Sequence, residues 1–223
     1  MPNPDPVKLA PHIVVLNYFS LLFIITGVTL TGLFNTTLLA HGLFMTGWFY
    51  LVPPLLARII ILFFGKPAGL VNTTSGTHTI WWCLFQLQLL FNRFPFLEEG
   101  LRVIPGLYAL WLNLWGAKVN LFCFWAPGVT VMDRYHLEIG KGAILGTGCL
   151  LSAHVLVKKS NGEMILLVDK LKIGANALIG VQAILAPGCH IHPSEIVPAN
   201  KLLKPYTEIL GGKSRLLRKI DYR

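Results

Sequence analysis

The sequence predicts membrane-spanning α-helices followed by a left-handed parallel β-helix. Three observations lead to this fold class: an aliphatic repeat of period six in the C-terminal half, long apolar stretches near the N-terminus, and an uneven distribution of basic residues. Hydrophobic residues account for 54% of the 223 positions and charged residues for only 13%. That balance is too apolar for an ordinary soluble domain, so we expect part of the chain to lie in a membrane.

The repeat occupies residues 120–212, which we predict to form the β-helix. An aliphatic residue returns at every sixth position, in two runs: Ile139, Leu145, Leu151 and Val157, then Ile173, Ile179, Leu185, Ile191, Val197, Leu203 and Ile209. A period of six fits neither an α-helix nor a two-faced strand. It fits short strands joined by tight turns, three to a coil, each sending one aliphatic side chain to a shared axis.

The repeat is interrupted once, between Val157 and Ile173. Sixteen residues separate these two positions where the repeat allows six, so we expect an extruded loop over residues 158–170. The loop finds no place on its own prism, and we expect it to lie across a neighbouring subunit. Residues 213–223 follow the last coil as a basic C-terminal tail.

Residues 1–65 are predicted to contain a short leader and two transmembrane helices. The two apolar stretches, 13–34 and 38–64, each exceed the ~20 residues that a helix needs to cross a bilayer core of ~30 Å. Pro53 and Pro54 should kink the second helix, because proline removes a backbone donor from the helix interior.

The basic residues are concentrated behind this apolar region. Of the 19 Lys and Arg residues, only Lys8 and Arg58 precede Lys66, and the formal net charge is +9. The positive-inside rule then places both termini in the cytoplasm, and we expect an integral protein of a bacterial cytoplasmic (inner) membrane. The chain has no basic helix or aromatic–basic motif that reads nucleic acid. Anionic membrane lipid or a phosphate-bearing cosubstrate is therefore the expected partner of this charge.

Residues 66–119 combine a polar connector with two aromatic helical segments. Polar side chains interrupt both segments, which is typical of helices that lie at the headgroup boundary. Tryptophan favours that boundary, so we interpret the segments as interfacial amphipathic helices rather than core helices. The tryptophans concerned are Trp81, Trp82, Trp111 and Trp115.

Four segments of the C-terminal part carry a further signal: residues 150–154 (Leu-Leu-Ser-Ala-His), 173–180, 183–188 and 210–220. Together they resemble the hexapeptide-repeat acyltransferases, most of all the sugar and xenobiotic O-acetyltransferases. The resemblance covers about the last third of the chain, and the N-terminal half resembles membrane-attached relatives. It implies a homotrimeric enzyme with a histidine base directly before the loop, and coenzyme A lying in a groove between two prisms.

Acyl transfer to a hydroxyl or amine needs a base for the acceptor's proton and a partner that orients the base. His154 is the first choice for the base, because it precedes the loop and histidine has an ordinary pKa of ~6.5. His136 lies eighteen residues earlier, one full coil, so both rings could project from one edge. Asp133 is close enough in sequence to orient either ring. His190 and His192 are interpreted as solvated side chains, one of which could line a cofactor groove.

The donor is expected to be acyl-CoA, which is a cosubstrate and not a permanently bound cofactor. Its phosphates require cations or hydrogen-bond donors. The candidate contacts are Asn176, Lys201, Lys204, Lys213 and Arg215. An acidic acyl carrier protein could use the same basic surface.

The predicted function is transfer of an acyl group from acyl-CoA to a hydroxyl, or less readily an amine, of a lipophilic or membrane-associated acceptor. One alternative is a non-enzymatic trimeric membrane scaffold. Another is a zinc enzyme similar to the γ-carbonic anhydrases, which needs paired histidines within one coil. His136 and His154 are a full coil apart, and the four cysteines form no CxxC pair, so no metal site is expected.

Overall fold

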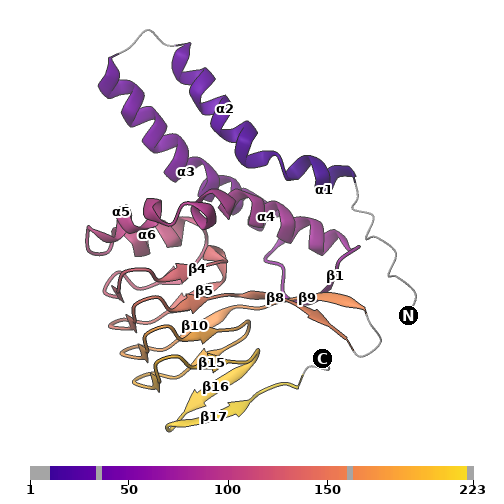
Figure 1. Ribbon diagram of the computed structural model, residues 1–223, viewed down its shortest axis with the longest axis vertical. Helices are drawn as coiled ribbons and strands as arrows, with labels where there is room; N and C mark the ends of the chain where they lie inside the picture. The colour runs from indigo at the N-terminus through magenta and orange to yellow at the C-terminus, as the bar shows by residue number, and fades with distance from the viewer. Residues whose placement is uncertain (1–10, 34–36, 160–162, 220–223) are drawn as a thin grey trace.

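A computed structural model describes residues 11–33, 37–159 and 163–219, and it divides them into a helical region and a parallel β-helix (Figure 1). The β-helix lies beneath α4 to α6, while α2 and α3 project away from it as a hairpin (Figure 1). The helices are α1 (Pro11–Leu16), α2 (Phe19–Gly32), α3 (Leu38–Phe64), α4 (Gly76–Arg93), α5 (Phe96–Arg102) and α6 (Leu107–Leu114).

Three parallel sheets form the sides of the prism. The first face contains β2 (Lys118–Val119), β5 (Leu137–Ile139), β10 (Leu171–Ile173), β13 (His190–Ile191) and β16 (Thr207–Leu210). The second face contains β3 (Phe124–Trp125), β6 (Ile144–Leu145), β11 (Leu178–Ile179) and β14 (Ile196–Val197). The third face contains β4 (Thr130–Val131), β7 (Leu150–Leu151), β12 (Ile184–Leu185) and β15 (Leu202–Leu203).

The six-residue repeat forms the axis of this prism, as the sequence predicts. Along the first face Ile139, Ile173, Ile191 and Ile209 stand in register, and every predicted axial residue except Val157 belongs to one continuous buried core. Left-handed backbone conformations recur at the corners with the same spacing, at Asn176, Gln182, Gly188, Ser194, Asn200 and Tyr206. The parallel prism is therefore confirmed, while the hand of its coil stays a prediction.

The boundaries of the prism differ from the predicted ones at both ends. Its first strand begins at Lys118, and Val119 and Val131 already belong to the axial core. At the other end β17 (Lys213–Leu216) pairs antiparallel with β16, so the residues predicted as a tail add a strand to the first face. Residues 213–216 are ordered as a strand because they form hydrogen bonds with the open edge of β16, and the charge of the segment does not predict this pairing.

The interruption is a β-hairpin, and it begins earlier than predicted. Strands β8 (His154–Lys158) and β9 (Met164–Val168) pair with each other, and β9 also pairs with β1 (Gly69–Asn72) of the connector. Val157 therefore lies in the hairpin and not in the axis. β1 and Trp81 of α4, in the same chain, hold part of this segment, while its contact with a neighbouring subunit stays a prediction. Part of the predicted loop, residues 160–162, lies outside the described residues.

The first predicted membrane span is divided into two helices. The break falls at Asn17 and Tyr18, and the Asn17 side-chain oxygen accepts hydrogen bonds from Trp82 and Gln86 of α4. At 14 residues α2 is about 21 Å long, which is short of a bilayer core of ~30 Å. Within the described part of the chain, only α3, with 27 residues and a mean hydropathy of 1.8, is long and apolar enough to cross a membrane. Two transmembrane helices are thus not confirmed.

Helix α3 continues through its two prolines with the help of a hydrogen bond from α6. Pro54 lacks an N–H group, so the carbonyl of Tyr50 loses its partner within the helix. The indole N–H of Trp111 donates to that carbonyl at 2.8 Å. Closer to its start, α3 packs against α2 at Gly27, where an added Cβ would lie 2.7 Å from the Trp48 ring.

The aromatic helices α4 and α6 cap the first coil of the β-helix. Trp81, Trp111 and Trp115 are each at most 5% exposed, and Trp111 and Trp115 belong to the same core as the axial residues. The tryptophan argument for a headgroup location therefore fails for these three rings, which the protein covers, whereas Trp82 is half-buried and the interfacial location of the helices stays a prediction. Here the aromatic residues extend the core beyond the open end of the prism.

Candidate active site

The candidate site lies at the corner where the chain passes from the third face to the first. Elsewhere this corner is a tight turn, but two coils carry insertions there. The first insertion is a short 3-10 helix, η1 (Arg134–His136), which directly follows Asp133. The second is the β8–β9 hairpin, which begins at His154. Since these insertions stand on successive coils, they bring Asp133 and His154 together.

Asp133 and His154 form a hydrogen-bonded pair. The distance from His154 Nδ1 to Asp133 Oδ2 is 2.7 Å, and the backbone N–H of Ala153 donates to the same oxygen at 3.0 Å. The Asp133 side chain is fully buried, whereas that of His154 is 17% exposed. With Nδ1 bound to the carboxylate, Nε2 is the ring nitrogen that can accept a proton from a substrate.

Electrostatics hold this pair in a defined protonation state. Burial by itself would lower the pKa of His154 and raise that of Asp133. Their mutual attraction and hydrogen bond outweigh burial, so the pKa of His154 is raised and that of Asp133 is lowered. Asp133 therefore remains a carboxylate and makes His154 a stronger base.

Aromatic side chains of α4 cover the His154 ring. The centroids of Trp81 and Phe85 lie 5.0 Å and 5.6 Å from the centroid of His154, both edge-on. Trp81 also packs with Val71, Leu166 and Val168 of the connector and hairpin. The site is thus a partly open imidazole in an apolar surround, which sequence reasoning missed because α4 is distant in the sequence.

His136 does not share this surround with His154. Its side chain is 4% exposed, and Nε2 lies 2.7 Å from the carbonyl oxygen of Pro67. Burial lowers the pKa of His136, so the ring is neutral and donates to that carbonyl. The expectation that both imidazoles project from one edge is wrong, because η1 turns His136 toward the connector.

Arg134 anchors the turn that carries Asp133. It is 1% exposed, its backbone N–H donates to Gln88 at 2.6 Å, and its Nε donates to Glu98 at 2.5 Å. Its guanidinium also reaches Asn92 at 2.9 Å. The neighbour of Asp133 is thus tied to α4 and α5. No spacing rule identifies Arg134, because its partners lie 36 to 46 residues away.

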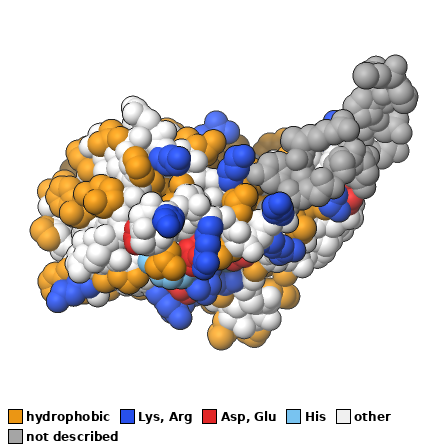
Figure 2. All heavy atoms as spheres, turned by 90° about the horizontal axis from the view of Figure 1, so that it is seen from below, with side chains coloured by type: hydrophobic (Ala, Val, Ile, Leu, Met, Phe, Trp, Pro, Cys, Tyr) orange, Lys and Arg blue, Asp and Glu red, His pale blue; other side chains and the backbone are white. Residues whose placement is uncertain are grey.

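Three of the five predicted cofactor contacts lie together at the C-terminal end of the prism. Lys201, Lys204 and Arg215 line a cavity of about 210 Å³, and Figure 2 shows Lys and Arg side chains gathered over this end of the molecule. Strand β15 beside the cavity lies two strands from β7, which is about 10 Å along the axis. Lys213 and Asn176 do not line this cavity. Asn176 occupies a different corner, where its side chain covers Gly142.

Two acetyltransferases are among the solved structures that are similar to this chain. One is a maltose O-acetyltransferase from Clostridium difficile 630, and the other is a hexapeptide-repeat-containing acetyltransferase from Vibrio cholerae. Both are 15% identical to this chain and match 59% of it with a TM-score of 0.35. The match covers 88% of the first structure's chain and 90% of the second's. No protein-family model and no curated protein matches the sequence. A similarity of this level identifies no activity for the chain.

Proposed function

We propose that the protein is an acyltransferase with His154 as its general base. The observation that carries this proposal is the His154–Asp133 pair under Trp81 and Phe85, with Nε2 left for a substrate. A buried carboxylate that fixes one ring nitrogen is the arrangement that activates histidine toward a hydroxyl.

The reaction follows from that geometry. Nε2 of neutral His154 takes the proton of an acceptor hydroxyl as its oxygen attacks the thioester carbonyl. The tetrahedral intermediate then loses the thiolate by breakage of the C–S bond, and His154 returns its proton to the sulfur. The Asp133 carboxylate stabilises the imidazolium between these two steps.

The proposed donor is acyl-CoA, bound by the cavity of Lys201, Lys204 and Arg215. Cations suit its phosphates, and the cavity is separated from His154 by about two strand spacings, or ~10 Å, which an extended thioester arm can bridge. An acyl carrier protein is the alternative donor. Direct binding of coenzyme A, weakened by Lys204→Ala, separates the two donors.

The proposed acceptor is lipophilic. Trp81 and Phe85 surround the base, and α3 exposes leucine and phenylalanine side chains that lipid would cover. An apolar groove of about 850 Å³ also lies between α1, α3 and α4, on the side of α4 opposite Trp81 and Phe85. These features support attachment to a membrane. The charge distribution supports a cytoplasmic location for the β-helix.

The proposed assembly is a homotrimer built on the second and third faces. Outward strand side chains on these faces are apolar apart from Thr130, and Ile144, Leu178 and Ile196 stand in one row on the second. The first face instead carries the charged residues Lys118, Glu138 and Lys172 in register, which is typical of a face exposed to solvent. Ile144→Glu/Ile196→Glu should therefore dissociate the assembly in detergent. Lys118→Glu is the matched control, and equal masses for both variants by native mass spectrometry would contradict this arrangement.

Thiol release from acyl-CoA in the presence of lipophilic alcohols tests the activity. The full-length protein in detergent should release thiol and form ester, whereas His154→Ala should bind coenzyme A but lose ester formation. Equal ester formation by both proteins would overturn the role of His154. Absence of coenzyme A binding, measured by calorimetry, would instead favour an acyl carrier protein as donor, and absence of ester formation with either donor would favour the scaffold alternative.

A further inference from the structure

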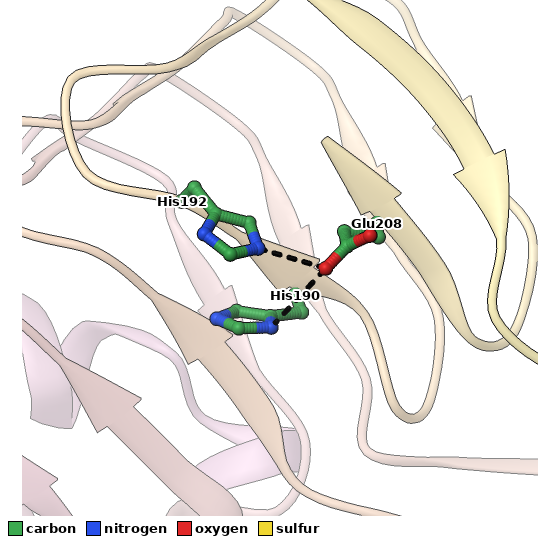
Figure 3. Close-up of side chains that lie close together, drawn as sticks. All are labelled: His190, His192 and Glu208. Atoms are coloured by element: carbon green, nitrogen blue, oxygen red, sulfur yellow. Dashed lines mark hydrogen bonds and ion pairs between the residues drawn. The ribbon is translucent and has the colours of Figure 1, made fainter. Parts of the chain in front are cut away.

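A second histidine–carboxylate cluster lies on the outer side of the first face, apart from His154. His190 and His192 flank the inward-facing Ile191, so both rings stand on the outer side of β13. Glu208 of β16 lies directly opposite His190 in the parallel ladder. Figure 3 shows both rings directed at one oxygen of the Glu208 carboxylate. The cluster therefore joins two neighbouring coils near the C-terminal end.

The distances in this cluster differ between the two rings. His192 Nε2 lies 2.8 Å from Glu208 Oε1, which is a hydrogen bond, whereas His190 Nδ1 lies 3.9 Å from the same oxygen. At 3.9 Å His190 is too distant for a hydrogen bond, although its nitrogen points at the carboxylate. The two rings stack with centroids 4.1 Å apart. A simple ion pair needs one ring, so the position of the second ring calls for another explanation.

Glu208 is held for this role by the strand on its other side. The carboxylate is only 5% exposed, and Nε of Arg215 on β17 donates to its second oxygen, Oε2. Hydrogen bonds from His192 and Arg215 lower the pKa of Glu208, which keeps the carboxylate charged. Arg215 thus fixes the carboxylate and leaves Oε1 to the histidines. Carboxylates that bind metal ions are commonly held in place by such a hydrogen bond from a neighbouring side chain.

The three side chains lie close to the dimensions of a metal site. His190, His192 and Glu208 each offer one ligand atom, and these atoms lie within 4.8 Å of one another. A tetrahedral zinc ion with bonds of ~2.0–2.2 Å holds its ligand atoms about 3.4 Å apart. Small rotations of two partly exposed rings would close that difference. Two histidines and one carboxylate also form a known zinc ligand set that leaves a fourth position open.

We propose that His190, His192 and Glu208 bind a divalent transition-metal ion of the zinc class. The ligands are Nδ1, Nε2 and Oε1, with Arg215 on the other carboxylate oxygen. Binding replaces the hydrogen bond between His192 Nε2 and Glu208 Oε1 with bonds from both atoms to the ion. The ion joins β13 to β16 and so stabilises the last coil of the prism. This site is separate from His154, and it does not depend on the acyltransferase proposal.

Zinc titration of the chelator-treated full-length protein in detergent tests the site. Isothermal calorimetry should give one zinc ion per chain, and zinc should raise the unfolding temperature. His190→Asn/His192→Asn should weaken zinc binding by at least ~100-fold, because removal of a metal ligand costs more affinity than removal of a residue that only hydrogen-bonds to a ligand. The matched control is His154→Gln, which removes a histidine beside the other carboxylate and should bind zinc like the wild type.

A spectroscopic measurement keeps the test independent of stability. Co²⁺ in place of zinc should give the intense visible bands of a four-coordinate site in the wild type and in His154→Gln, but not in the double variant. The proposal is overturned if the wild type shows no saturable binding at one ion per chain. Equal zinc affinity of the wild type and the double variant would overturn it as well.

Discussion

His154 and His192 each lie within 2.8 Å of a carboxylate oxygen, but the two pairs have different surroundings. The His154 pair is covered by two aromatic rings of α4, and the carboxylate of Asp133 is fully buried. The His192 pair stands on an outer sheet face beside a second histidine and Arg215. The same two functional groups therefore meet an apolar surround in one place and a polar row in the other.

This difference teaches what each pair can do. In the apolar surround one carboxylate serves one imidazole, which raises the pKa of His154 and favours proton transfer. On the open face one carboxylate serves two imidazoles, which suits a cation with several ligands. The contrast arises from the corner insertion: a regular turn leaves β13 open, whereas the hairpin brings His154 under α4.

Removal of the His154 ring is the strongest way to test this contrast. His154→Ala should lower kcat/KM for ester formation by roughly two to four decades, the usual contribution of a general base. His136→Ala should instead lower the unfolding temperature, because its ring binds the connector at Pro67. Steady-state rates and thermal unfolding of both variants check this. A larger rate loss for folded His136→Ala than for His154→Ala would mean that His136, and not His154, is the base.

Replacement of the orienting carboxylate should have the next largest effect. Asp133→Asn should lower the maximal rate by roughly two decades, the lower end of what a general base contributes, because the ring loses its fixed tautomer. The carboxylate raises the pKa of His154, so its loss should also move the acid limb of the rate profile to lower pH. Rates measured across the pH range decide this. An acid limb that stays in place would mean that another group is titrating.

The aromatic cover should contribute a smaller effect, confined to the acceptor. Trp81→Ala should raise KM for a lipophilic alcohol by about tenfold, because ~1.4 kcal/mol of apolar contact is a modest part of an indole side chain. The KM for acyl-CoA should change little. Trp48→Ala is the matched control, because Trp48 stacks on Phe23 of α2 and its indole N–H donates to the carbonyl of that residue. Equal changes in both variants would remove Trp81 from the acceptor site.

The smallest expected effect concerns the pH dependence of stability. The pKa of His154 is raised on folding, so its contribution is fully present below the unfolded value of ~6.5 and is lost as pH rises through the folded value. The difference in unfolding free energy between the wild type and His154→Gln should therefore be larger near pH ~6 than near pH ~9. Denaturant titrations at both values measure it. A difference that grows with pH would contradict the ion pair.

Much of the β-helix could be predicted, because its repeat is local. Ile173 and Ile191 are predictable axial residues since every coil repeats the same short strand and turn. The prediction for Val157 was wrong because a local repeat does not report pairing with other strands. Its spacing fits the repeat, but hydrogen bonds to β9 place it in a hairpin. The aromatic helices were misjudged because tryptophan suits both a headgroup boundary and a protein core, and composition does not distinguish these two locations.

The sequence alone determined the parallel prism, its axial residues except Val157, and the candidates His154, His136 and Asp133, without deciding which histidine Asp133 orients. These follow from periodicity and from the position of an interruption, which are local properties of the chain. Only the tertiary structure decided that His154 bonds Asp133 while His136 bonds Pro67, that α4 covers the site, and that Glu208 joins two histidines. Those contacts join residues distant in sequence, and they depend on side-chain directions that no repeat encodes.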